Sequence, residues 1–560
     1  MDGLPRELIE AILQQCINYG PKNAVLELRL VCRVFDQVLK PFACRTLDLE
    51  FSRLSKTSGE TPPQIDALQT IGYHCKSIYI DLMVLRDDSE LRNYVSRKVV
   101  TNKNEFPVEV EFLDTVFARV PSMTEFCQTL HKKYCMNETS FTETDYYRTV
   151  EEMLFYCRDV DRLRLNLPFQ LVGRHCNAAT MILANTLKAF AHRPEEDSAK
   201  LNTLVIENVT DVAIRHLWMN PIDVMNIMKV LEVLEHLVLT LRRHENEPIT
   251  VGLFGSCLWN LVETAGDLKS LCLIGMDHDD RPPRGLKQTK FWQMPVDEWR
   301  AKSLPVPNVI HSNLTCLELK RIELCPEVFV RTAENFGPTL QELYLNEVYL
   351  KVEQSRDWNE DSKKILWVGL PNQRPGEGCH WIAMALRCAT PHMRICRASF
   401  LAYDHYMLED MPGQPEFDLA DPCGLGRSIS QRFVEVVMGI HQPTALTKDV
   451  VEYLPADTHF DNLVNNLRPR DCAPRVVEYD TNAYQTAVAN STSEWQRSID
   501  GVFPNCNSNT LDELHYIAET ACQGMNEIHR RRNEWTAENS MVTEFTENLF
   551  NIPASDDEHA

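Results

Sequence analysis

A short leucine pattern, L-x-x-L-x-L and its relaxed forms, recurs along most of this chain and constrains the fold more than any other feature. The clearest copy contains Leu314, Leu317 and Leu319, whose alternation is typical of a short strand with one buried face. Residues 326–336 follow with helical spacing, and Gly337 with the proline after it ends that helix before the next copy begins. Each unit is therefore predicted to be a strand followed by a helix.

Successive copies of the pattern begin between 26 and 53 residues apart. One strand–helix unit cannot bury its own apolar face, so repeated units are expected to stack, bury a continuous core and align their strands on one concave wall. The alternative is an ordinary α/β domain in which the leucines only mark buried strands. The copies begin at Cys44, Cys75, Met123, Val160, Leu201, Leu234, Leu268, Leu314, Leu340 and Met393, and those at Met123 and Met393 are weak.

Composition limits the partners and the compartment. At 560 residues the chain exceeds what one hydrophobic core usually supports, and its formal charge of −23 argues against binding nucleic acid or anionic membranes. No stretch approaches the ~20 apolar residues of a membrane span, and residues 4–16 do not resemble a signal peptide. Nineteen cysteines without a C-x-x-C pair are typical of free thiols in a reducing compartment. We expect a cytoplasmic and/or nuclear protein that binds neither nucleic acid nor membranes.

The sequence contains no catalytic motif that would identify an enzyme. H-E-x-x-H, G-x-S-x-G and G-x-x-x-x-G-K-[ST] are all absent. His131 to Cys135 and the Cys379-His380 pair each lack a second pair of ligands that would complete a metal site. We expect no catalytic residues, no cofactor and no metal.

Two amphipathic segments fill most of the first fifty residues, and the helix-stopping pair Gly20-Pro21 separates them. Pro5 suits a first helical turn, because its missing N–H is not needed there. Apolar residues step by threes and fours in both segments, which predicts helices over residues 4–16 and 28–42. These apolar residues are Leu4, Leu8, Ile9, Ile12, Leu13 and Cys16 in the first segment, and Leu28, Val31, Cys32, Phe35, Val38, Leu39 and Phe42 in the second.

This N-terminal stretch resembles the F-box. The family's L-P-x-E-[LI]-[LI]-x-x-I-L helix is present as residues 4–13, its second helix as residues 28–35, and its L-x-L strand as residues 47–49. The loop between the helices departs from the family, since it is longer than in many members and contains Gly-Pro. The strand–helix units that follow resemble a leucine-rich-repeat solenoid in the irregular form common behind F-boxes, although most units exceed the usual ~20–29 residues.

The resemblance implies a substrate-recognition subunit of an SCF-type cullin–RING ubiquitin ligase, acting in ubiquitin-dependent protein degradation. Such a subunit is not itself an enzyme. It would bind the SCF adaptor, and through it a cullin, while the repeats hold a target protein. The implied adaptor-binding residues are Leu4, Pro5, Leu8, Ile9, Ile12, Leu13, Leu28, Val31 and Phe35.

Two other functions stay open. A repeat scaffold that never joins a ligase predicts that the N-terminal helices pack wholly against the first repeats and leave no exposed apolar stripe. An enzyme with a site among the insertions predicts a deep pocket with convergent polar side chains.

The predicted fold class is α/β: an N-terminal helical F-box, an irregular leucine-rich-repeat-like solenoid, and a mainly helical C-terminal region. The corresponding domains are residues 1–46, 47–409 and 410–548, followed by an acidic, disordered tail at 549–560. Insertions near 277–308 and 351–378 carry Trp292, Trp299, Trp358 and Trp367, which either bind a partner or pin the loops to the repeats.

Overall fold

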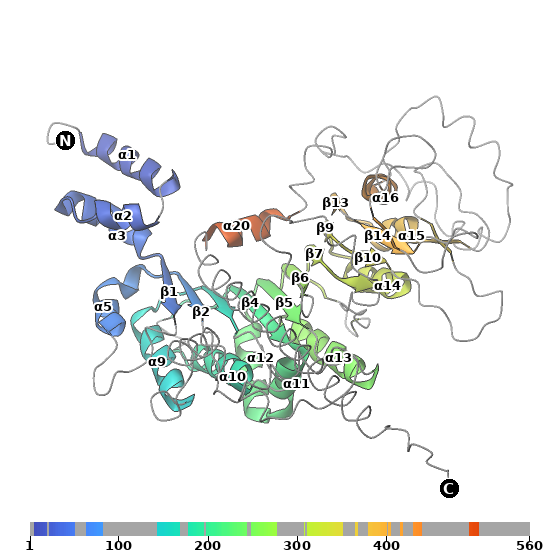
Figure 1. The fold of residues 1–560 in the computed structure, drawn as a ribbon, viewed down its shortest axis with the longest axis horizontal. Helices are drawn as coiled ribbons and strands as arrows, with labels where there is room; N and C mark the ends of the chain where they lie inside the picture. The colour runs from blue at the N-terminus through green and yellow to red at the C-terminus, as the bar shows by residue number, and fades with distance from the viewer. Residues whose placement is uncertain are drawn as a thin grey trace, which may run out of the picture. The chain divides into compact units, whose positions relative to one another are not determined.

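The computed structural model contains N-terminal helices followed by a long sheet with helices between its strands (Figure 1). It describes residues 5–19, 22–50, 63–81, 143–167, 177–194, 198–242, 248–276, 307, 311–350, 365–367, 379–399, 401–404, 415–417, 429–438 and 492–502. The predicted copy at Met123, the tryptophans Trp292, Trp299 and Trp358, and the acidic tail lie outside these residues.

The main sheet has nine strands, every neighbouring pair is parallel, and the strands follow one another in space in their order along the chain. Each strand begins two residues after the start of a predicted leucine copy, so the predicted α/β repeat is confirmed for the described units. The strands are β1 Thr46–Glu50, β2 Ser77–Asp81, β3 Arg162–Asn166, β4 Thr203–Thr210, β5 His236–Arg242, β6 Ser270–Met276, β7 Cys316–Lys320, β9 Glu342–Asn346 and β13 Ile395–Ser399.

The strand register aligns the leucines in rows across the sheet. The second residue of each strand pairs with the second residue of the next, as Leu237 does with Leu271 and Leu271 with Leu317. The fourth residues, such as Leu239 and Leu273, form a second row. Since side chains alternate along a strand, both rows face the helices, and the first, third and fifth residues face the opposite side of the sheet.

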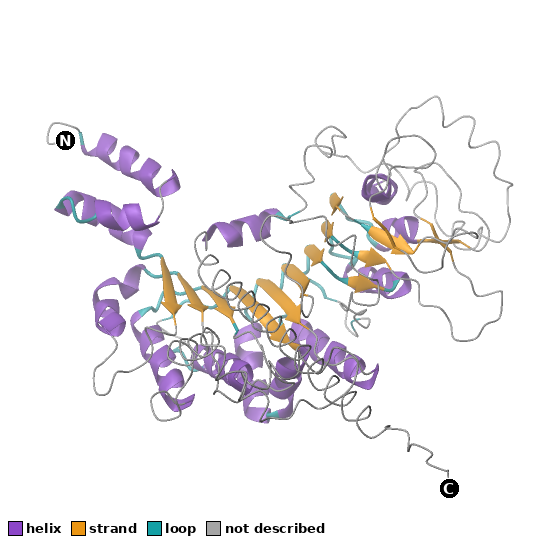
Figure 2. Ribbon diagram, viewed as in Figure 1, coloured by secondary structure: helices purple, strands orange, loops and turns teal. Residues whose placement is uncertain are grey.

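Helices cover one face of the sheet and connect successive strands (Figures 1 and 2). The predicted helix over residues 326–336 is confirmed by α14, which has those bounds. Gly337 ends it, and a Cβ there would collide with the carbonyl oxygen of Ala389, so the close approach of the next helix requires glycine. The connecting helices are α5 Pro63–Ile71 with the 3₁₀ turn η1 Gly72–His74, α9 Glu143–Tyr156, α10 Asn177–Ala191, α11 Asp211–Met219, α12 Pro221–Leu231, α13 Pro248–Thr264, α14 Pro326–Phe336 and α15 Ile382–Ala389.

A second, smaller sheet lies beyond the ends of the later strands. After β7 and β9 the chain turns through Arg321 and Glu347, both with φ of 53°, and their side chains pair with Nε 2.7 Å from Oε2. The turns lead into short strands that the leucine pattern does not predict. This sheet contains β8 Glu323–Leu324, β10 Tyr349–Leu350, β14 Ala402–Asp404 and β15 Pro415–Phe417, and a separate pair joins β11 Ile365–Trp367 to β12 Cys379–Trp381.

Two helices, α16 and α20, are described after β15. α16 spans Ile429–Met438, inside the region expected to be mainly helical, and buries Phe433, Val434 and Val437. α20 spans Glu494–Val502 and contacts the main sheet far from its own place in the sequence.

The N-terminal region forms three helices, where two were predicted. α1 spans Arg6–Tyr19, α2 Lys22–Leu28 and α3 Arg33–Ala43. The prediction of one helix over residues 28–42 is therefore wrong. The backbone turns at Leu30 and Val31, whose N–H groups donate hydrogen bonds to the carbonyl oxygens three residues earlier. Cys32 is extended, with φ −160° and ψ 166°.

Candidate functional site

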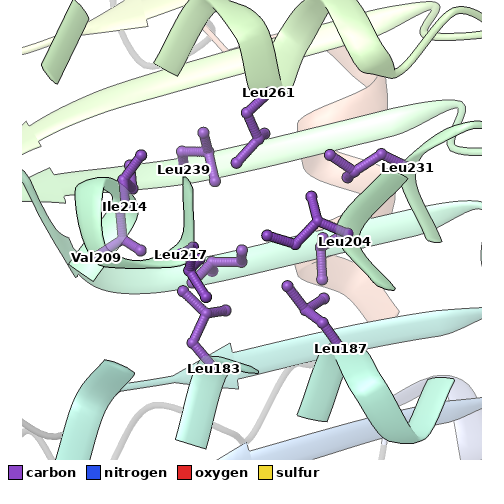
Figure 3. A pocket seen from close by; sticks show the side chains of 11 residues that line it. Leu183, Leu187, Leu204, Val209, Ile214, Leu217, Leu231, Leu239 and Leu261 are labelled. Atoms are coloured by element: carbon purple, nitrogen blue, oxygen red, sulfur yellow. The ribbon is translucent and has the colours of Figure 1, made fainter. Parts of the chain in front are cut away.

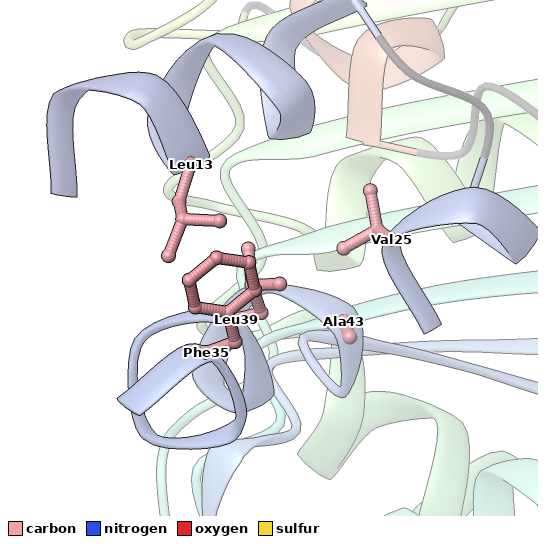
Figure 4. Close-up of a cluster of buried hydrophobic side chains, with 5 residues drawn as sticks. All are labelled: Leu13, Val25, Phe35, Leu39 and Ala43. Carbon is pink, nitrogen blue, oxygen red and sulfur yellow. The ribbon is translucent and has the colours of Figure 1, made fainter. Parts of the chain in front are cut away.

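The three N-terminal helices share a small apolar core of their own (Figure 4). Leu13 from α1 and Val25 from α2 meet Phe35, Leu39 and Ala43 from α3, and all five are buried. Partly buried side chains surround them: Ile9, Ile17, Leu26, Leu28 and Val38. All five buried residues of this core come from the three N-terminal helices and none from the repeat helices.

Helix α1 carries two apolar stripes. Ile9, Leu13 and Ile17, spaced by four residues, face the core of the three helices. Leu8 and Ile12 lie about one helical position away and face solvent, with 52% and 46% of their surface exposed. Because burying such side chains is favourable, an exposed pair at this spacing is suited to contact a partner.

The turn between α2 and α3 exposes further apolar side chains. Leu30 is 87% exposed and Val31 65% exposed, and Val34 follows in the first turn of α3. Arg29 and Asp36 bracket this turn with an ion pair, Nε to Oδ1 at 2.9 Å. With Phe42, we call these the N-terminal apolar residues: Leu8, Ile12, Leu30, Val31, Val34 and Phe42.

The predicted adaptor-binding residues differ in how far they are buried. Pro5, Leu8, Ile12 and Val31 are exposed; Ile9 and Leu28 are half-buried; Leu13 and Phe35 are buried; Leu4 lies outside the described residues. Sequence reasoning missed Leu30 and Val34. The available signal was their apolar character at positions that helical spacing places on the polar face.

The third helix also lies near the first repeat. Burial lowers the pKa of His74 in η1, and the positive charges of Lys40 and Arg29 lower it further. The backbone oxygen of Arg45 accepts hydrogen bonds from the N–H groups of Lys76 and Ser77, so the end of α3 leads directly into the sheet. The N-terminal helices are thus joined to the repeats through β1.

A second group of exposed apolar side chains lies on the repeat helices. Met219 at the end of α11 and Ile222, Met225 and Met228 of α12 are all at least half exposed. The other side of α12 buries Ile227, Val230 and Leu231 in the repeat core. We call the exposed group the α12 apolar residues.

Beneath these helices, the interior pocket between β4, β5 and helices α10 to α13 is a packing gap. Figure 3 shows aliphatic side chains, such as Leu204, Leu239 and Leu217, converging on it. Its free space is about 10 Å³, no more than one water molecule needs. With an entirely apolar lining, it offers no polar group to orient a substrate.

Among the residues that the structure describes, no group of three or more His, Cys, Asp or Glu side chains is arranged to hold a metal ion. No helix there combines the length and apolar character needed to cross a bilayer.

No protein-family model matches this chain, and no curated protein matches it. The candidate site is therefore identified from the positions and the exposure of its residues. The N-terminal apolar residues, carried by a separate small core, are the surface best suited to a protein partner.

Proposed function

We propose that this chain is the substrate-recognition subunit of an SCF-type cullin–RING ubiquitin ligase. Its N-terminal helices would act as an F-box that binds the SCF adaptor, and its α/β repeat, of the leucine-rich type, would hold the target protein. The observation that carries the proposal is the exposure of Leu8 and Ile12 on α1 and of Leu30 and Val31 in the turn after α2, next to the buried core that the three N-terminal helices share.

The N-terminal residues divide into two roles under this proposal. Leu8, Ile12 and Val31, with Pro5 beside them, would lie against the adaptor. Leu13 and Phe35 would act indirectly, because they hold the helices at the angle that presents the exposed residues. Each exposed side chain that becomes buried is expected to contribute about 1.5–3 kcal/mol to binding.

The chain would do no chemistry itself. Holding a target lysine near a ubiquitin-loaded conjugating enzyme replaces a bimolecular encounter with a high effective concentration. The receptor would therefore need two binding surfaces and no catalytic residues, cofactor or metal.

The exposed residues also weigh against the alternative of a scaffold that does not join a ligase. That alternative predicts helices packed wholly against the repeats, whereas Leu30 and Val31 are among the most exposed apolar residues described. No observation on the described residues favours an enzyme.

The test is co-purification from a cell lysate. The intact chain should bring down the SCF adaptor and a cullin, and a Leu8→Gln, Ile12→Gln variant should bring down neither. Both substitutions lie on the exposed stripe of α1, so the variant should keep its fold, which circular dichroism checks. Absence of the adaptor from the intact chain would reject the proposal in favour of the scaffold.

A further inference from the structure

Helix α20 lies on the face of the main sheet opposite the repeat helices (Figure 1). Its buried residues Ser493, Gln496 and Ile499 recur every three positions and so form one side of the helix. Glu494 and Arg497 lie on the exposed side. The chain thus places a short helix of its own on the sheet surface that the repeat helices leave uncovered.

The N-terminus of α20 is anchored to a buried carboxylate. Glu318 of β7 is 1% exposed, and its Oε2 accepts hydrogen bonds from the Oγ of Ser493 at 2.7 Å and the N–H of Ser493 at 3.3 Å. Ser493 Oγ also accepts from the N–H of Gln496 at 3.0 Å, which caps the helix. Lys320 Nζ lies 2.8 Å from the other oxygen of Glu318. A helix N-terminus beside a carboxylate is electrostatically favourable.

The rest of α20 reaches across the sheet. The ring of Trp495 lies 4.4 Å from the imidazole ring of His236 on β5. At the other end, Thr46 Oγ1 on β1 donates to the carbonyl oxygen of Val502 at 3.2 Å. Three strands far apart in sequence therefore contact this one helix.

The fit of α20 is incomplete. Ile499, which is 7% exposed, is the one aliphatic side chain that α20 buries, whereas α14 buries Phe329, Ala333 and Phe336. Two buried polar atoms where α20 meets the sheet have no hydrogen-bond partner among the described residues: His236 Nδ1 and Gln496 Oε1. Unpaired buried groups weaken an interface.

One electrostatic interaction between α20 and the sheet is also between like charges. Burial raises the pKa of the Glu342 carboxyl, and the nearby Glu494 raises it further, against the hydrogen bond that Tyr344 donates at 3.1 Å. Glu494, the residue that follows the helix cap, therefore lies close enough to the Glu342 carboxyl to act on it electrostatically, and it carries the same charge. A lysine or arginine at that position would complement the sheet better.

We infer that α20 can be displaced, and that the sheet face beneath it binds a short helix of the target protein in its place. This target helix has an unmodified serine or threonine at its N-cap and a basic residue directly after it. This inference rests on the proposed function, since it names the segment that the target receptor recognises. The hydroxyl is required because Glu318 offers only acceptor atoms. A phosphorylated hydroxyl is excluded, because a phosphate would meet the buried Glu318 carboxylate.

The test uses the full chain and a fluorescent peptide of residues 490–504 that carries Glu494→Lys, with binding followed by fluorescence anisotropy. In the wild-type chain α20 competes with the peptide. A chain carrying Ser493→Asp places a second carboxylate against Glu318 and should release α20, which hydrogen exchange of residues 494–502 reports. Since apparent affinity scales with the open fraction, this chain should bind the peptide at least about tenfold more tightly.

Three matched controls sharpen the result. Ser498→Asp lies on the exposed side of α20 and should leave peptide affinity unchanged. When Glu318→Gln is added to Ser493→Asp, the affinity for the peptide should fall by about tenfold, because a charge-assisted hydrogen bond is lost. The same peptide phosphorylated at position 493 should not bind.

The inference is overturned if Ser493→Asp leaves α20 protected, or releases it without any gain in peptide affinity. Adaptor binding is measured on the same samples. Peptide binding without adaptor binding would reject the proposed ligase role alone, and adaptor binding without peptide binding would reject this inference alone.

Discussion

The N-terminal apolar residues and the α12 apolar residues are similarly exposed, but the helices that carry them pack on different cores. Leu8 and Ile12 are 52% and 46% exposed, while Ile222 and Met225 are 64% and 71% exposed. The α12 residues lie on a helix whose inner side belongs to the repeat core, whereas the N-terminal ones lie on three helices with a core of their own. Exposure alone therefore does not mark a binding site. The distinguishing feature of the N-terminal residues is a core that contains no residue of the repeat helices.

The first prediction separates the two regions by stability and has the largest expected effect. Phe35→Ala removes a buried ring from the small core and should destabilise the three helices by about 3–5 kcal/mol. Adaptor binding should be lost while the repeats stay folded. Hydrogen exchange should show faster exchange at residues 6–43 and unchanged protection at residues 236–276.

Leu271→Ala is the matched control for that experiment, because Leu271 lies in the repeat core. It should expose residues 236–276 to exchange at a cost of about 2–5 kcal/mol. If Phe35→Ala instead unfolds both regions in a single transition, the two cores are not independent and the comparison fails.

The second prediction uses acid to weaken the repeats. Burial lowers the pKa of His236 to about 4, with Glu235 opposing this and Lys269 and Arg162 adding to it. In the unfolded chain the imidazole titrates near 6.5 and gains its proton first, so stability is complete above about pH 6.5 and falls as pH drops toward 4. The loss between pH 7 and pH 5 should be about 1 kcal/mol once solvent screening is included.

Urea unfolding at pH 7 and pH 5 measures this loss, and His236→Gln provides the control. The variant keeps a neutral polar side chain at every pH, so the difference between the two pH values should shrink. An identical pH dependence in the variant and the wild type would show that His236 does not cause the loss of stability in acid.

The third prediction concerns the turn that exposes Leu30 and Val31. Asp36→Asn removes the charge that pairs with Arg29 across this turn. Because the pair is partly exposed, the expected cost is about 0.5 kcal/mol, which is roughly a twofold loss of adaptor affinity. Calorimetric titration can resolve it, and a change above tenfold would mean that the pair does more than hold the turn.

The repeating units could be predicted from sequence because their signal is local. Alternating leucines locate β1, β2 and the later strands, and the Gly-Pro pair at residue 337 locates the end of α14. In α1 the same spacing does not separate Leu8 and Ile12 from Ile9 and Leu13, since the two stripes are neighbours on the helix. Only packing shows which stripe is buried.

Contacts between distant segments could not be predicted in this way. Ser493 and Glu318 are 175 residues apart, and Thr46 and Val502 are 456 residues apart. Neither pair belongs to a periodic pattern, because each joins two isolated polar residues. The break between α2 and α3 was missed for a related reason: the apolar spacing continues through Val31 although the backbone there does not remain helical.

Calorimetric titration of the purified full chain with the purified SCF adaptor tests the central claim most directly. The wild type and an Ile222→Gln, Met225→Gln variant should bind equally well, and Leu8→Gln with Ile12→Gln should weaken binding by more than about 100-fold, the factor expected when two buried side chains are lost. Equal binding by all three proteins, or no binding by the wild type, would contradict the assignment of the N-terminal helices as the adaptor-binding surface.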